Sequence, residues 1–197
     1  LEKRNVKRLT GFSEADVTSF FWAANDRLLF TTGDTQGFER RGDGGLFGID
    51  VDGSNGRTLV EPIRSGRSEA KFVLRLTTIV GRIKDNKDEI LVSANDRIAD
   101  SQDLYRMNMR TGRKTLLSFT GPGKVQRWVF DKDNVPRAAF SGDFEKREWW
   151  FSYRSKEDAP WKVLAKWDEN LKDVIIPRSF DRTDNTKMYV TSNVGRD

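Results

Sequence analysis

The chain has 197 residues, of which 36% are hydrophobic and 33% are charged, so it can bury a core but is polar for its length. It contains neither Cys nor His, which excludes disulfides, thiolate sites and any Ser-His-Asp or Cys-His catalytic group formed by this chain alone. Its net charge of +5 comes from interleaved acidic and basic residues without a basic stripe carrying aromatics, so nucleic acid is not an expected partner.

The apolar residues are dispersed along the chain. No run of about 18 apolar residues occurs, so a membrane is not an expected partner. No signal peptide is visible, and the lack of Cys is compatible with the periplasm or the cytoplasm. The 16 Gly and six Trp favour many short strands and turns over helices.

Two kinds of hairpin alternate along the chain. The first kind has an apolar stretch, an Asn/Asp-rich turn and a second apolar stretch, because Asn and Asp bond their own backbone in such turns. It occurs at residues 20–32, 82–94, 128–140 and 179–192. In the second kind, at residues 104–117, Tyr105, Met107 and Met109 alternate with polar residues before a turn at Gly112. Similar segments occupy residues 46–60 and 150–164.

Together the hairpins make a repeating unit of four strands, which predicts an all-β, partial β-propeller of WD40 or TolB type. We expect one domain, residues 1–197, with three blades and a final half-blade, about 17–60, 74–117, 125–164 and 174–197. A β-sandwich is the alternative, although it would not show this paired repeat. Residues 61–73 are interpreted as an inserted loop, and Asn5 to Leu9 as a spare strand of a preceding unit.

Three aromatic residues occupy matching places before the Asx turns: Trp22, Trp128 and Phe180. We expect them to pack between neighbouring blades. The alternative is a ring of aromatic side chains that stacks on a ligand at the mouth of the channel.

One segment has the residue types of a calcium-binding loop. Residues 50–56 read DVDGSNG, and Glu61 lies twelve positions into the segment. Gly stands at position seven instead of six and the helical flanks of such a loop are missing, so we favour a hairpin turn whose Asp side chains bond local amides. The same interpretation applies to Asp131, Asp133 and Asn134.

No catalytic, cofactor-binding or metal-binding residue is assigned from the sequence. The carboxylate pairs Glu169 with Asp173 and Glu145 with Glu148 are near neighbours in sequence, which does not establish a shared pocket. Ser residues near Gly do not form a G-x-S-x-G nucleophile elbow, and they stand at positions 13, 65, 68 and 141.

The hairpin sequences resemble the propeller of S9 (prolyl oligopeptidase-type) serine peptidases. The resemblance rests on LYRMNMRTGRKTLL at 104–117, GPGKVQRWVFDKDNVPRAAF at 121–140 and WWFSYRSKEDAPWKVL at 149–164. It covers most of the chain from about Val17, and MYVTSNVGRD at 188–197 is similar to the second strand of a further blade. These motifs concern blade packing and carry no information about substrate.

The resemblance implies a noncatalytic cap that gates the access of short peptides to an α/β-hydrolase domain. Because this chain has no His and no nucleophile elbow, it is not expected to be an enzyme itself, and we expect a fragment whose parent is a serine peptidase. The implied partners are that hydrolase domain and the parent's peptide substrates. Because three and a half blades cannot close into a ring, a second copy of the chain joined through open blade edges is a further expected partner. The alternatives are a stand-alone TolB- or WD40-like scaffold that binds protein, and a carbohydrate-binding propeller.

Overall fold

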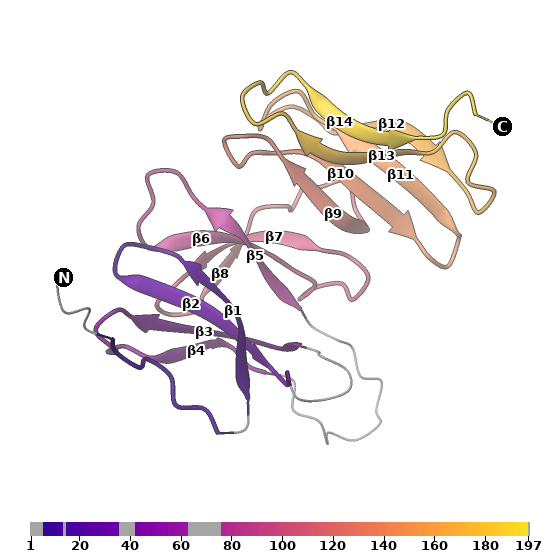
Figure 1. The fold of residues 1–197 in the computed structure, drawn as a ribbon. Helices are drawn as coiled ribbons and strands as arrows, with labels where there is room; N and C mark the ends of the chain where they lie inside the picture. The colour runs from indigo at the N-terminus through magenta and orange to yellow at the C-terminus, as the bar shows by residue number, and fades with distance from the viewer. Residues whose placement is uncertain (1–5, 14, 36–41, 63–75, 197) are drawn as a thin grey trace. The chain divides into compact units, whose positions relative to one another are not determined.

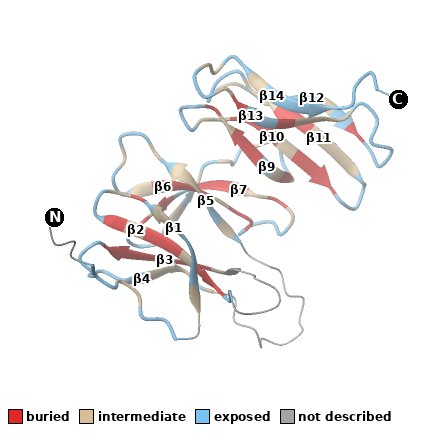
Figure 2. Cartoon of the chain, viewed as in Figure 1, coloured by how far each residue is buried: buried red, intermediate tan, exposed pale blue. Residues whose placement is uncertain are grey.

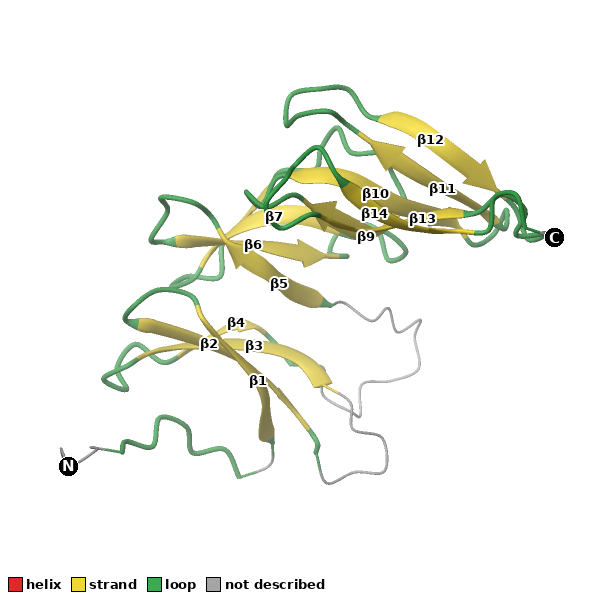
Figure 3. Cartoon of the chain, turned by 45° about the horizontal axis from the view of Figure 1, so that its top comes forward, coloured by secondary structure: helices red, strands yellow, loops and turns green. Residues whose placement is uncertain are grey.

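The computed structural model describes residues 6–13, 15–35, 42–62 and 76–196 (Figure 1). Within these ranges the chain forms strands and loops, with no helix (Figure 3). The described residues therefore include no helix of the length and hydrophobicity that crossing a membrane requires. The prediction of an all-β fold is confirmed.

The strands form four antiparallel sheets, each in the order of the sequence. The first sheet contains β1 (Asp16–Trp22), β2 (Arg27–Gly33), β3 (Gly42–Asp50) and β4 (Arg57–Val60). The second contains β5 (Thr77–Arg82), β6 (Glu89–Ala94), β7 (Asp103–Asn108) and β8 (Lys114–Leu116). The third contains β9 (Val125–Phe130), β10 (Pro136–Asp143), β11 (Glu148–Tyr153) and β12 (Lys162–Trp167). A two-stranded sheet of β13 (Ile175–Phe180) and β14 (Met188–Ser192) follows.

These bounds agree with the predicted four-stranded units to within a few residues. One expectation is wrong: Val6 to Leu9 are not in a strand. Here Lys7 instead donates a hydrogen bond through Nζ to the carbonyl of Asp52. Most of the expected insertion, residues 63–73, lies outside the described residues.

The chain divides into two compact units, and the prediction of a single domain stays a prediction. One unit comprises residues 1–92 with 106–115, and the other comprises residues 93–105 with 116–197. The boundary passes through the sheet β5 to β8, whose strands contribute residues to both units.

Within the first sheet, the buried apolar side chains lie mainly in the two middle strands (Figure 2). Leu29 and Phe30 of β2 and Leu46 of β3 are buried, because a middle strand is covered by neighbours in the sheet. Phe30 stacks on Phe47 with their ring centroids 5.5 Å apart, and Phe12 packs edge-on against both rings. A segment outside the sheet thus covers part of its apolar face.

In the second unit, side chains of the third sheet and of the β13–β14 hairpin meet in a second core. Its buried members are Val129, Ala138, Phe151, Trp167 and Phe180. The register pairs Ala138 with both Val129 and Tyr153, so their side chains lie on the face that the hairpin covers.

The three aromatic residues that precede the Asx turns, which we expected to pack between blades, differ in burial. Trp128 is 8% exposed and Phe180 is 7% exposed, so both are buried as predicted. The Nε1–H of Trp128 donates to the carbonyl of Gln102 at 2.8 Å, and its ring lies 5.6 Å from that of Trp161. For Trp22 the prediction is wrong, because this side chain lies at the end of β1 and is 44% exposed.

We predict that replacing Trp128 with Ala lowers the free energy of unfolding by about 3–5 kcal/mol, because it opens a large cavity and removes the indole donor. Trp22→Ala is the matched control and should cost about 1 kcal/mol or less, as expected for a half-exposed side chain. Denaturant unfolding followed by circular dichroism measures both. Equal losses in the two variants would show that burial does not distinguish these residues.

Candidate functional site

The segment that resembles a calcium loop is the turn between β3 and β4. The carboxylate of Asp52 accepts hydrogen bonds from the backbone N and the hydroxyl of Ser54, at 2.8 and 2.6 Å. The backbone closes through Gly53, whose φ of 82° is readily adopted by glycine and whose N donates to the carbonyl of Asp50. The two hydrogen bonds from Ser54 hold the pKa of the Asp52 carboxyl below its usual value. The predicted hairpin turn with locally bonded Asp side chains is confirmed.

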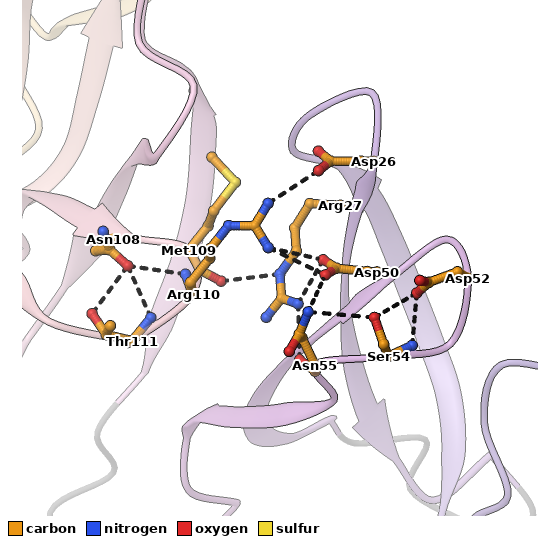
Figure 4. A network of polar contacts seen from close by, with 10 residues as sticks. All are labelled: Asp26, Arg27, Asp50, Asp52, Ser54, Asn55, Asn108, Met109, Arg110 and Thr111. Atoms are coloured by element: carbon orange, nitrogen blue, oxygen red, sulfur yellow. Dashed lines mark hydrogen bonds and ion pairs between the residues drawn. The ribbon is translucent and has the colours of Figure 1, made fainter.

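The carboxylate of Asp50 points away from such a metal site and into a group of arginines (Figure 4). Asn55 Nδ2 donates to Oδ2 at 2.7 Å, and Arg27 Nη1 donates to Oδ1 at 2.9 Å. Arg110 Nη1 lies 3.1 Å from Oδ1 and 3.2 Å from Oδ2. The hydrogen bond from Asn55, followed by the bond and charge of Arg27, lowers the pKa of Asp50. This carboxylate is already matched by cationic partners.

Arg27 is the most buried charged residue of this group, with 1% of its surface exposed. Its Nη1 also donates to the carbonyl of Asn55 at 2.9 Å, and its Nε donates to the carbonyl of Met109 at 3.3 Å. Space for the guanidinium comes from Gly48, since a Cβ there would lie 2.6 Å from Arg27 Nη2. The free-energy cost of burying the charge is offset because hydrogen-bond acceptors surround the guanidinium.

Arg110 extends the network to the turn between β1 and β2. Its Nη2 donates to Asp26 Oδ2 at 3.1 Å, and its side chain remains 41% exposed. The next turn residues are held by Asn108, whose Oδ1 accepts from the backbone N of Arg110 and of Thr111. The buried network therefore joins three turns of the first unit, and we interpret it as a structural group.

In the second Asp-rich turn, between β9 and β10, the aspartates are likewise bonded by nearby amides and by cations. Asp131 Oδ1 accepts from the backbone N of Asp133 and of Val135, each at 3.0 Å, while Oδ2 pairs with Arg137 at 3.3 Å. Asp133 is bonded by Lys132 and by Asn185 Nδ2. Across the part of the chain that the structure describes, no group of three His, Cys, Asp or Glu residues is placed to hold a metal ion.

One member of each carboxylate pair forms an ion pair at the surface. Glu169 pairs with Arg147, and Glu148 pairs with Lys166 at 3.0 Å.

Two of the four serines noted in the sequence lie in the described part of the chain. Ser141 is buried in β10, and its hydroxyl has no hydrogen-bond partner within the described residues. Ser13 is exposed, and residues 65 and 68 lie outside the described residues.

A cavity that sequence reasoning missed lies in the second unit, between the third sheet and the β13–β14 hairpin. Its volume is about 410 Å³, which is within the range of small-ligand pockets. We call it the Trp149 cavity, and its lining residues are Phe140, Trp149, Trp167, Leu171, Val174, Ile176, Thr191, Ser192 and Asn193. Trp149, Phe151 and Tyr153 recur at every second position of β11 and were a signal for an apolar face, but the hairpin that closes the cavity lies further along the chain, at Ile175–Phe180 and Met188–Ser192.

Comparison with known proteins does not assign the chain to a family. No protein-family model matches the sequence, and no curated protein matches it. Function is therefore argued from the residues and geometry described above.

We predict that Arg27→Met lowers the free energy of unfolding by about 3–5 kcal/mol, because it leaves the buried oxygens of Met109 and Asn55 without their donor. Arg110→Met is the control within the same network and should cost about 1 kcal/mol or less, since its partly exposed ion pairs are weak. Denaturant titration of both variants measures the difference. A larger loss for Arg110→Met would contradict the assignment of Arg27 as the central residue.

Asp50 should also make stability depend on pH. Because its pKa is lowered in the folded state, its contribution is present above its unfolded pKa of about 3.9 and is lost as pH falls through the folded value. In Asp50→Asn the unfolding free energy should be lower at pH 7 and should fall less between about pH 5 and pH 2. Parallel pH profiles for the two proteins would refute this assignment.

Calcium should leave the stability unchanged, because Asp50 and Asp52 are occupied by arginine and serine donors. Thermal unfolding with calcium and with a chelator should give the same midpoint within error. A rise in Tm with calcium that disappears in Asp52→Asn would restore the metal-loop interpretation.

Proposed function

We propose that the chain is a partial β-propeller that serves as the noncatalytic cap of an S9-type serine peptidase and restricts short peptides on their way to a hydrolase domain. The observation that carries the proposal is the succession of three four-stranded antiparallel sheets and one hairpin, each in sequence order. This is the strand order of propeller blades, in which the first strand lines a channel and the fourth is outermost.

The contacts between first strands support this arrangement in each unit. In the first unit, Arg82 of β5 donates through Nε to the carbonyl of Trp22 in β1 at 2.9 Å. In the second unit, Arg127 of β9 donates through Nη2 to the carbonyl of Pro177 in β13 at 2.5 Å. In a propeller the first strands of consecutive blades are neighbours, so side-chain bonds of this kind are expected there.

The exposed side chains of β1 favour a second candidate, a propeller scaffold that binds protein. Phe20 is 69% exposed and Trp22 is 44% exposed, and both lie in this strand. Exposed aromatic side chains are common anchors in protein interfaces. A partner protein isolated with the chain, together with loss of the complex in Phe20→Ser, would favour this candidate over the cap.

The purified chain should have no peptidase activity, because it contains no His to act as the base of a serine peptidase. Chromogenic short peptides and a fluorophosphonate probe measure this directly. Stoichiometric labelling of a serine by the probe would contradict the noncatalytic assignment.

The cap role is tested on the product of the whole gene. We expect it to hydrolyse short peptides in preference to folded or long chains, and to lose that preference when residues 17–197 are deleted while labelling by the fluorophosphonate persists. A gene product that takes no fluorophosphonate label, or whose length preference survives the deletion, would overturn the proposal.

A further inference from the structure

Two arginines of the second unit lie together on neighbouring first strands. Arg127 is in β9, and its Nη2 donates to the carbonyl of Pro177 in β13. Arg178 is the next residue of β13, and its Nε donates to Thr191 Oγ1 at 2.7 Å. Partial burial and the nearby charge of Arg178 lower the pKa of Arg127. The two like charges are thus close enough to act on each other.

Neither guanidinium is neutralised by the described part of the chain. Arg27, Arg97, Arg110 and Arg137 each form an ion pair with an aspartate, whereas Arg127 and Arg178 form none with a described carboxylate. A guanidinium offers five N–H donors, and one donor of each side chain has a hydrogen-bond acceptor among the described residues. Most of the donors are available to an anion from outside.

The arginine pair adjoins the Trp149 cavity. Arg127 is the cross-strand partner of Phe140, and Arg178 is bonded to Thr191; both partners line the cavity. Ile176, another lining residue, immediately precedes the proline that Arg127 bonds. The other lining residues are mostly aromatic and aliphatic, with Ser192 and Asn193 at the end of the hairpin. The arginines do not line the cavity themselves; they border it through Phe140 and Thr191.

We propose that Arg127 and Arg178 bind a carboxylate and that the Trp149 cavity takes the apolar side chain next to it, so that the site recognises the C-terminal residue of a short peptide. Paired guanidiniums match the two oxygens of a carboxylate, and the positive pair next to an apolar cavity matches an apolar residue that ends in a negative charge. The choice of a peptide over another apolar carboxylate rests on the proposed function.

Binding is measured on this chain by isothermal titration or by NMR shifts, with N-acetyl-Gly-Phe as the probe. We expect binding that weakens about tenfold or more when the C-terminal carboxylate is replaced by an amide, since a charge-assisted pair is lost. N-acetyl-Gly-Gly, which keeps the carboxylate but lacks the apolar side chain, should also bind more weakly. Equal binding of the amide, or tighter binding of phenyl phosphate or 3-phenylpropionate, would overturn the assignment to a peptide carboxylate.

The variants Arg127→Gln and Arg178→Gln should each weaken binding of N-acetyl-Gly-Phe about tenfold. Arg182→Gln is the matched control: it removes the same charge from the same hairpin, at an exposed position in the turn after β13. If Arg127→Gln unfolds because the bond to Pro177 is lost, Arg178→Gln still provides the test, as its bond is to an exposed threonine hydroxyl. If Arg182→Gln lost as much affinity for the peptide, the effect would come from the net charge of the hairpin, and the proposed site would be overturned.

The binding assay and the test of the cap role can each overturn one proposal and leave the other in place. A chain that does not bind the peptide, within a gene product that still selects short peptides, would overturn the arginine site and leave the cap. A chain that binds the peptide through Arg127 and Arg178, within a gene product without peptidase activity, would support the site and overturn the cap.

Discussion

A charged side chain that is removed from water must find acceptors inside the protein, and Arg27 imposes this requirement on the first unit. Its guanidinium is bonded to the carboxylate of Asp50 and to the carbonyls of Asn55 and Met109. Those acceptors belong to segments separated by tens of residues, so they meet only when the sheet and the following turn are both in place. The ion pair therefore ties the register of β2 and β3 to the position of the turn after β7.

In the second unit, aromatic side chains pack between the third sheet and the β13–β14 hairpin and so join these two sheets. Trp167 and Phe180 enter one core, and Arg137 lies 5.5 Å from the ring centroid of Phe180. In both units an arginine lies at or next to the start of the second strand of its sheet and pairs with an aspartate, Arg27 with Asp50 and Arg137 with Asp131. Arg137 also lies against the rings of Tyr153 and Phe180, so the surrounding residues decide whether an aromatic face accompanies the ion pair.

Local features were predictable from the sequence, and long-range ones were not. The turns formed by Asp52, Asn108 and Asp131 depend on bonds to residues two to four positions away, so the residue types alone indicate them. The arginine partners of Asp50 are 23 and 60 residues away, and no short pattern identifies them. The exposure of Trp22 and the Trp149 cavity depend equally on which segments pack together. Val6 to Leu9 were expected to form a strand, but the sequence does not show which strand would pair with them.

The close approach of Gly48 to Arg27 restricts the order in which this protein can change during evolution. A methyl group at position 48 would lie 2.6 Å from Nη2 of Arg27 and 2.9 Å from a methyl of Leu29. Any larger residue there must displace the guanidinium from its acceptors and also shift the side chain of Leu29. A smaller residue at position 27 removes the first of these two obstacles, so substitutions at positions 27 and 48 are coupled.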